Sequence, residues 1–206
     1  MTFRGQKFSA AFTLVELLVG ATLSAAVMAA VFSSYIYLGR SLARLANQQI
    51  LETEARRALG YFAQDVQTAT GLTDTANLSA TRLSLTVPSG TTTNTITYYY
   101  NNGVAATSVT VNGTSVSMEA TALTRCVYNG ATVTAQTLVR NLTSLSLKYY
   151  DSSANEYTSY TDYLPGIKQV ALQFSSQLGN ANNGTQTLVY QMTSNRVILR
   201  NRGFLQ

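Results

Sequence analysis

Glu16 is the residue whose type and position most clearly suggest chemistry. It is the one acid in an otherwise apolar run, and residues 17–38 carry no charge at all. A carboxylate in such a segment costs roughly 2.5–3.5 kcal/mol on membrane-insertion scales, so an acid kept there is usually functional and has a cationic partner. The alternative interpretation is an acid that is tolerated near a membrane interface.

A second group of acids lies in residues 151–166. Asp151, Glu156 and Asp162 occur there together with Asn155. Carboxylate and amide oxygens are suitable ligands for Ca²⁺, which makes these four residues a weak calcium candidate. Their spacing does not match an EF-hand loop, so a solvated loop is the simpler interpretation. We predict no metal site and no cofactor.

Tyrosines form a third group that could bind a partner. They are Tyr98, Tyr99, Tyr100, Tyr157, Tyr160 and Tyr163. Together they could make an adhesive or glycan-stacking surface, but alternate packing on the two faces of a sheet explains such a run more simply.

The composition excludes several kinds of enzyme. The chain has no His, so histidine acid–base catalysis and histidine metal sites are absent. Its single cysteine, Cys126, permits no internal disulfide and lies in an apolar context that predicts a buried side chain. No nucleophile triad, phosphate loop or carboxylate pair can be assembled, and we predict that the chain is not an enzyme.

The charge is mildly basic. The net charge is +5 over 206 residues, and only 11% of the residues are charged. Arg4 and Lys7 precede the apolar run, and without them the side chains sum to +3, from 12 basic and 9 acidic residues. This balance alone does not indicate binding to nucleic acid. The polar remainder, rich in Thr, Ser, Asn and Tyr, is typical of an extracytoplasmic β domain.

Two helical segments should position Glu16. Residues 12–38 predict a membrane span, because the 22 uncharged residues 17–38 would extend about 33 Å as a helix. In residues 39–70 the apolar residues recur every three or four positions, which predicts an amphipathic continuation. Gly71 is a helix stop signal.

Residues 71–206 change to a period of two, which predicts a β domain. The expected strands are residues 83–87 ended by Pro88, 95–100, 109–111, 116–118, 123–128, 142–151, 170–174, and one or two within 188–199. Asn112-Gly113 predicts a tight hairpin, and Asn102-Gly103, Asn129-Gly130 and Asn183-Gly184 are similar turn signals. About eight strands after one long helix predict an α+β fold, with one antiparallel sheet packed on the amphipathic half of the helix.

The stretch Ala11-Phe12-Thr13-Leu14-Val15-Glu16-Leu17-Leu18-Val19-Gly20 resembles the processing site of type IV prepilins and type II secretion pseudopilins. The resemblance implies that residues 1–11 are a leader, that a prepilin peptidase cuts between Ala11 and Phe12, and that Phe12 becomes the methylated N-terminus. It also implies that Glu16 pairs with the N-terminal amine of a neighbouring subunit during assembly. Ala11 stands where the family usually has glycine, and the only prolines are Pro88 and Pro165, so the helix lacks the kinking proline of many major pilins.

A looser resemblance extends to the larger minor pilins and J-type pseudopilins. It rests on residues 138–140, 141–145 and 148–151 and on the ending 196–202. It implies a priming or tip-proximal subunit whose partners are other pilin subunits, the peptidase, the inner-membrane assembly platform and membrane lipid. The expected location is the bacterial inner membrane with a periplasmic β domain, and then a periplasmic or surface filament.

Two alternative functions remain open at the sequence level. The first is a pilus-tip adhesin or DNA-uptake subunit that uses its tyrosine- or arginine-bearing surface. The second is a secreted β-domain protein with an ordinary signal peptide, for which Val27-Met28-Ala29 is a possible cleavage pattern.

Overall fold

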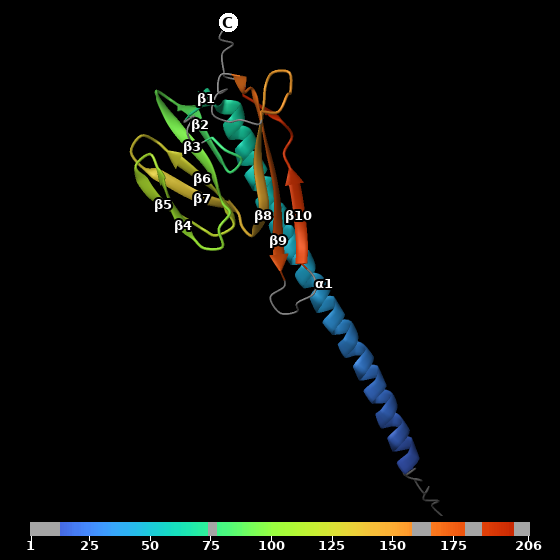
Figure 1. The fold of residues 1–206 in the computed structure, drawn as a ribbon. Coiled ribbons are helices and arrows are strands. Elements are labelled where there is room, and N and C mark those ends of the chain that lie inside the picture. Colours follow the sequence, from blue (N-terminus) through green and yellow to red (C-terminus); the bar gives the residue numbers. More distant parts are fainter. Residues whose placement is uncertain (1–12, 74–77, 158–165, 180–186, 200–206) are drawn as a thin grey trace, which may run out of the picture. The chain divides into compact units, whose positions relative to one another are not determined.

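The computed structural model describes residues 13–73, 78–157, 166–179 and 187–199, with only the backbone of residues 178–179 and 187–190. Ala11, Phe12, Tyr160, Asp162, Tyr163, the turn signal at 183–184 and the ending 200–202 therefore lie outside the described residues. The chain divides into two compact units, Met1–Ala46 and Asn47–Gln206. One helix, α1 (Leu14–Thr68), contributes residues to both units (Figure 1).

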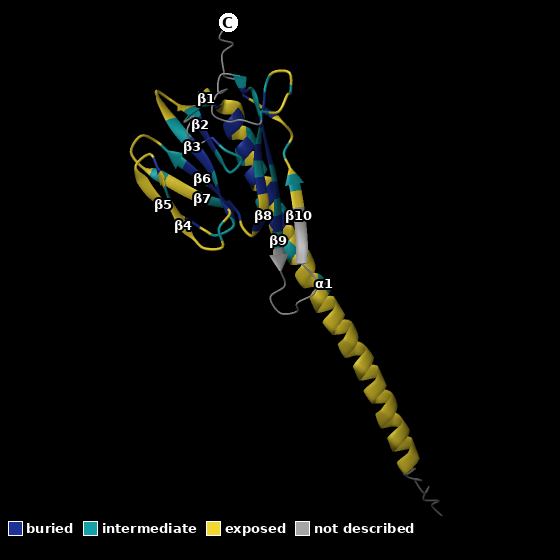
Figure 2. Cartoon of the chain, in the orientation of Figure 1, coloured by how far each residue is buried: buried dark blue, intermediate teal, exposed yellow. Residues whose placement is uncertain are grey.

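Within the first unit, every described residue of α1 except the half-buried Ser41 is exposed (Figure 2). The side chains of Leu23, Val27 and Phe32 are each about 60% accessible or more. This stretch is long and apolar enough to cross a membrane, and none of its apolar window is buried inside the molecule.

Within the second unit, α1 buries one face in the core. The buried helix residues are Leu51, Ala55, Ala58, Phe62, Asp65 and Val66. Apart from the adjacent pair Asp65 and Val66 they recur every three or four positions, which keeps them on one side of the helix. This confirms the amphipathic half predicted from the sequence. The helix ends at Thr68, and Gly71, expected as a stop signal, is instead the first residue of strand β1.

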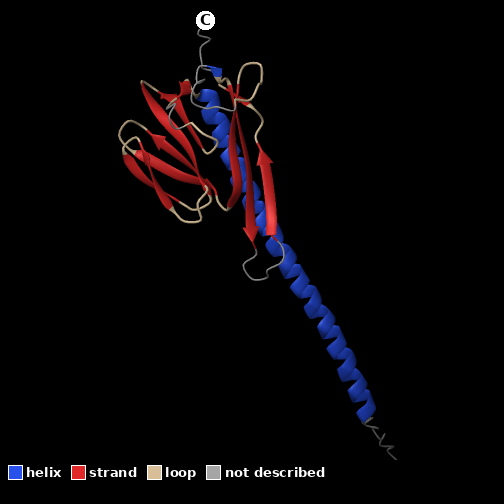
Figure 3. Ribbon diagram, viewed as in Figure 1, coloured by secondary structure: helices blue, strands red, loops and turns tan. Residues whose placement is uncertain are grey.

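The described strands of the second unit form two main antiparallel sheets and a separate hairpin (Figure 3). The five-stranded sheet has the order β1 (Gly71–Leu72), β2 (Arg82–Ser89), β3 (Thr92–Asn101), β6 (Ala122–Tyr128), β7 (Val133–Val139). In the other sheet β9 (Gln169–Gly179) pairs with β8 (Leu142–Tyr150), β10 (Thr187–Thr193) and β11 (Val197–Ile198). The α+β class with a long N-terminal helix is therefore confirmed.

The expectation of a single sheet on the helix was wrong. One hydrophobic core joins α1 to residues of both sheets, including Leu83 and Leu123 of the first and Leu147 and Phe174 of the second. The chain changes sheet between β7 and β8, at Asn141, whose φ of 54° is a left-handed conformation that asparagine tolerates. β8 then pairs with β9 rather than with β7.

The predicted Asn-Gly hairpin is confirmed in detail. β4 (Thr107–Val111) and β5 (Thr114–Met118) are joined by Asn112 and Gly113, with φ values of 47° and 82°. Positive φ at both positions is typical of a type I′ turn. Apolar side chains of this hairpin pack with Cys126 and Tyr99 into a second, smaller core.

Two strand predictions need correction. Pro88 does not end its strand, because β2 continues to Ser89 and Pro88 is opposite Thr93 of β3. On its other side β2 pairs with β1 only at Leu85 and Thr86, so Pro88 lies at a sheet edge, where proline is tolerated. Strand β7 was missed altogether, since residues 134–137 in its middle include no large apolar side chain.

Candidate functional site

Glu16 lies in the first turn of α1 and closes a capping box with Thr13. The Thr13 amide and hydroxyl each donate to Glu16 Oε2 at 3.1 Å, and the Glu16 amide donates to Thr13 Oγ1 at 3.3 Å. These reciprocal bonds satisfy N–H groups that have no partner within the helix, and a negative charge there is favoured by the helix dipole. Glu16 thus has a local structural role that the sequence interpretation did not anticipate.

The rest of α1 in the first unit supplies a lipid-compatible surface and one basic end. After Glu16 the next charged side chains are Arg40 and Arg44, one helical turn apart. Tyr35 and Tyr37, both 75% exposed, immediately precede them. The order acid, uncharged run, tyrosines and arginines agrees with a helix that crosses a membrane and emerges at its basic end.

The second unit contains a buried acid–base cluster that the sequence analysis missed. Asp65 of α1 is 5% exposed and accepts a two-pronged pair of hydrogen bonds from Arg125 of β6, at 2.6 and 2.9 Å. The hydroxyl of Tyr98, on β3, donates to the same carboxylate at 2.7 Å. The cluster therefore joins the helix to two neighbouring strands of the five-stranded sheet.

Burial and charge shift the titration of the cluster. Burial raises the pKa of Tyr98 far above its usual value, and the adjacent Asp65 charge raises it further. Burial alone would lower the pKa of Arg125, but its hydrogen bonds and ion pair with Asp65 outweigh that effect and raise it. Tyr98 therefore stays a neutral donor and Arg125 a cation, so the cluster serves as a structural clamp.

Aromatic contacts enclose the clamp. The ring of Phe62 meets Tyr98 edge-to-face with centroids 5.6 Å apart, and the Arg125 guanidinium lies 5.1 Å from the centroid of Tyr61. A signal for this site was present in the sequence. Asp65 falls among the apolar positions of an amphipathic helix, between Phe62 and Val66, where an unpaired carboxylate would be costly.

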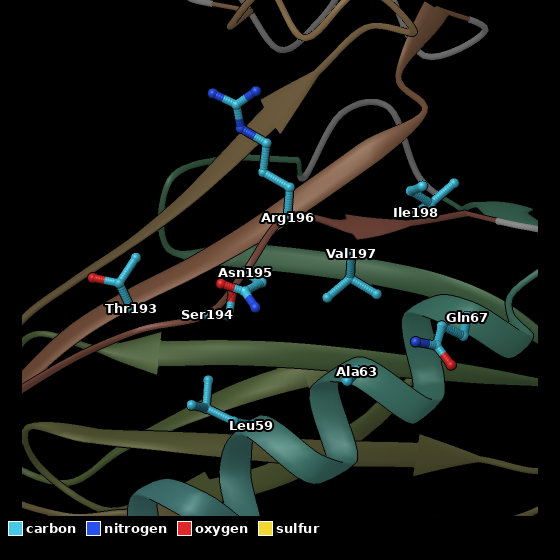
Figure 4. Close-up of a pocket in the computed structure, with 9 residues that line it drawn as sticks. All are labelled: Leu59, Ala63, Gln67, Thr193, Ser194, Asn195, Arg196, Val197 and Ile198. Carbon is cyan, nitrogen blue, oxygen red and sulfur yellow. The ribbon is translucent and has the colours of Figure 1, made fainter.

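A groove lies between α1 and the connection from β10 to β11. Its volume is about 470 Å³, and it is lined by Leu59, Ala63 and Gln67 of the helix and by residues 193–198 (Figure 4). Val197 points toward the helix, whereas Arg196 extends away and stacks 4.2 Å from the centroid of the Tyr150 ring. The groove presents amides, hydroxyls and apolar side chains but no carboxylate.

The weak calcium candidate has other partners. Asp151 Oδ1 accepts from the amides of Ser153 and Asn155, and Oδ2 accepts from the Asn155 side chain, all at 2.8 Å. These hydrogen bonds, led by those from Asn155, lower the pKa of Asp151. Glu156 pairs with Lys148 at 3.2 Å. Among the described residues there is no group of three or more His, Cys, Asp or Glu that could hold a metal ion.

The tyrosine run and the cysteine pack as the simpler interpretation predicted. Tyr98 and Tyr100 are buried in the main core, whereas Tyr99 packs on the opposite face against the second core. Tyr157 is partly buried against the main core. Cys126 is fully buried, and that burial raises the pKa of its thiol to about 11, so it remains protonated.

Comparison with known proteins adds no family to this picture. No protein-family model matches the chain, and no curated protein matches it at a significant level. The function is therefore argued from the sequence pattern around Glu16 and from the two halves of α1.

Proposed function

We propose that this chain is a minor pilin or pseudopilin, a structural subunit that assembles into, primes or caps a type IV pilus or a type II secretion pseudopilus. A prepilin peptidase would cut before Phe12. Phe12 would then be the new N-terminal residue, with a methylated amine. The other partners would be further pilin subunits, the inner-membrane assembly platform and membrane lipid. Before assembly, the subunit would be anchored in the inner membrane with its β domain in the periplasm.

The observation that carries this proposal is the contrast within α1. Its second half buries a regular stripe in the core of the β unit, whereas residues 14–46 expose long apolar side chains. Such a surface is costly in water and requires either lipid or other helices around it. A filament subunit has both in turn, first as a membrane protein and then as part of a helical bundle.

Glu16 would act at the transition between those two environments. In the single chain its carboxylate is bound by Thr13, which reduces the number of unsatisfied groups at the start of the helix. The cationic amine of a neighbouring Phe12 is a stronger partner, because two full opposite charges in apolar surroundings attract each other more strongly than a carboxylate attracts a neutral donor. Assembly would then exchange a local cap for an ion pair between subunits.

Mass spectrometry of the mature N-terminus tests this proposal. Full-length protein is isolated from membrane and sheared-surface fractions of the native host, and the N-terminal peptide is sequenced. An N-methylated peptide that begins at Phe12 is the expected result. A start near Ala30 would mean a signal peptide and a secreted protein, and an intact Met1 would mean a simple membrane anchor; either result would overturn the proposal.

A further inference from the structure

The two arginines at the end of the apolar run have no partner within the described residues. Arg40 and Arg44 are both exposed, and no hydrogen bond or ion pair links either of them to the described part of the chain. No acid lies between Glu16 and Glu52, so neither arginine has a carboxylate one helical turn away. Like charges four residues apart destabilise a helix slightly, and no described acid lies close enough to compensate.

Their position matches one particular environment. Arg40 and Arg44 lie two and six residues beyond Leu38, which is about 3 and 9 Å along the helix axis. The headgroup layer on each side of a bilayer core is roughly 5–8 Å thick. If the uncharged run fills the hydrocarbon core, the Arg40 backbone lies within the headgroup layer and the Arg44 backbone lies at its outer edge. The long arginine side chains can reach the lipid phosphates from both positions.

A tyrosine marks the same level. Tyr37 lies three residues before Arg40, on the same face of α1, and its side chain is 75% exposed. Tyrosine is enriched at membrane interfaces because its ring is apolar and its hydroxyl is polar. The guanidinium fork of arginine suits two oxygens of one phosphate.

We propose that Tyr37, Arg40 and Arg44 form a binding site for the headgroups of anionic phospholipids, at the leaflet where α1 leaves the membrane. The occupant follows from charge complementarity and from continuity with the apolar run. The site fixes the depth of the helix before assembly. This inference rests on the membrane anchoring in the proposed function, and not on the processing of the N-terminus.

Native mass spectrometry of the full-length protein in detergent tests the site. The protein is titrated with phosphatidylglycerol and, separately, with phosphatidylcholine, and bound lipids are counted. We expect wild type to prefer phosphatidylglycerol and Arg40→Gln/Arg44→Gln to lose roughly 25-fold of that preference, since each arginine near an anionic surface contributes a factor of about five. The preference should also shrink as ionic strength rises.

Two matched variants control for charge alone. Arg40→Lys/Arg44→Lys keeps the charge at the site and should keep most of the preference. Arg56→Gln/Arg196→Gln removes the same charge from exposed positions of the second unit and should bind lipid like wild type. Equal binding of both lipids by wild type, or an equal loss in this second control, would overturn the inference.

The outcome is separable from that of the proposed function. Lipid preference is measured on the purified chain, whichever residue forms its N-terminus. A chain with an intact Met1 that prefers phosphatidylglycerol would refute pilin processing and support the lipid site. A chain that begins at Phe12 and shows no preference for phosphatidylglycerol would support pilin processing and refute the lipid site.

Discussion

The two ends of α1 each carry an acid near apolar side chains, where a carboxylate needs polar partners. The two acids obtain these partners in different ways. Asp65 is buried and receives an arginine and a tyrosine from the chain itself. Glu16 is exposed and, among the described residues, accepts hydrogen bonds from Thr13 alone. The charge and hydrogen-bond partners of Asp65 therefore all come from the chain itself. Glu16 can still accept a partner from outside the chain, which the proposed assembly would require.

The largest expected effect concerns Glu16 and assembly. Glu16→Leu should insert in the membrane yet fail to enter filaments, because the pairing charge is lost. Glu16→Gln separates the two roles of the residue, since glutamine can close a capping box but carries no charge. We expect Glu16→Gln to assemble as poorly as Glu16→Leu, measured as the subunit content of sheared filaments against the membrane fraction.

Thr13→Val is the matched control for this experiment. It removes the side-chain partner of Glu16 but leaves the carboxylate free to form an ion pair. It should assemble nearly as well as wild type. Normal assembly of Glu16→Gln together with failure of Thr13→Val would instead make the cap, and not the charge, the function of Glu16.

The next effect concerns the stability of the second unit. Asp65→Ala leaves Arg125, whose side chain is only 16% exposed, without its counter-charge. Removal of one partner of a largely buried pair typically costs about 3–5 kcal/mol of unfolding free energy. Urea unfolding followed by circular dichroism measures the loss. Replacement of both partners, as in Asp65→Leu/Arg125→Leu, should recover much of it, because no unpaired charge then remains. A double variant as unstable as Asp65→Ala would show that the clamp contributes more than charge balance.

A pair of leucine substitutions sharpens the comparison between the two halves of α1. Leu51 is fully buried, and Leu51→Ala should destabilise the second unit by about 2–5 kcal/mol through the cavity it leaves. Leu23 is 62% exposed, so Leu23→Ala should leave the unfolding of that unit unchanged. Urea unfolding of both variants in one detergent provides the measurement. Equal losses would contradict the division of the helix into a core half and an external half.

Sequence alone predicted the features of this chain that depend on local pattern. The helix, its amphipathic half, the Asn112-Gly113 hairpin and most strands follow from periodicity and turn chemistry. The clamp could not be predicted from local pattern, because Asp65, Tyr98 and Arg125 are far apart in the chain. They meet only when the strands pair and the sheet packs on the helix. The division into two sheets could not be predicted for the same reason. It depends on the pairing of β8 with β9 and not on any residue within β8.

Part of the candidate site at Glu16 was also beyond the sequence interpretation. The unusual acid was recognised from its apolar surroundings, whereas its bonds with Thr13 were overlooked although Thr-x-x-Glu is a capping pattern. β7 was missed because residues 134–137 include no large apolar side chain, and only Leu138 and Val139 at its end are buried. Hydrophobic periodicity therefore predicts strands with several core-facing side chains and leaves strands with few of them uncertain.

The smallest expected effect concerns the exposed ion pair between Glu119 and Arg140. The hydrogen bond from Arg140 lowers the pKa of Glu119, and the Arg140 charge lowers it further, so the pair stabilises the folded state when Glu119 is ionised. That stability is present at neutral pH and is lost as the pH falls below the ordinary glutamate value of 4.5 and through the lower folded pKa. Because both side chains are about half exposed, the contribution should be only a few tenths of a kcal/mol. Glu119→Gln should accordingly differ from wild type in urea unfolding at pH 7 and converge with it near pH 3. A difference that persists unchanged at pH 3 would mean that Glu119 acts through packing or neutral hydrogen bonds rather than through its charge.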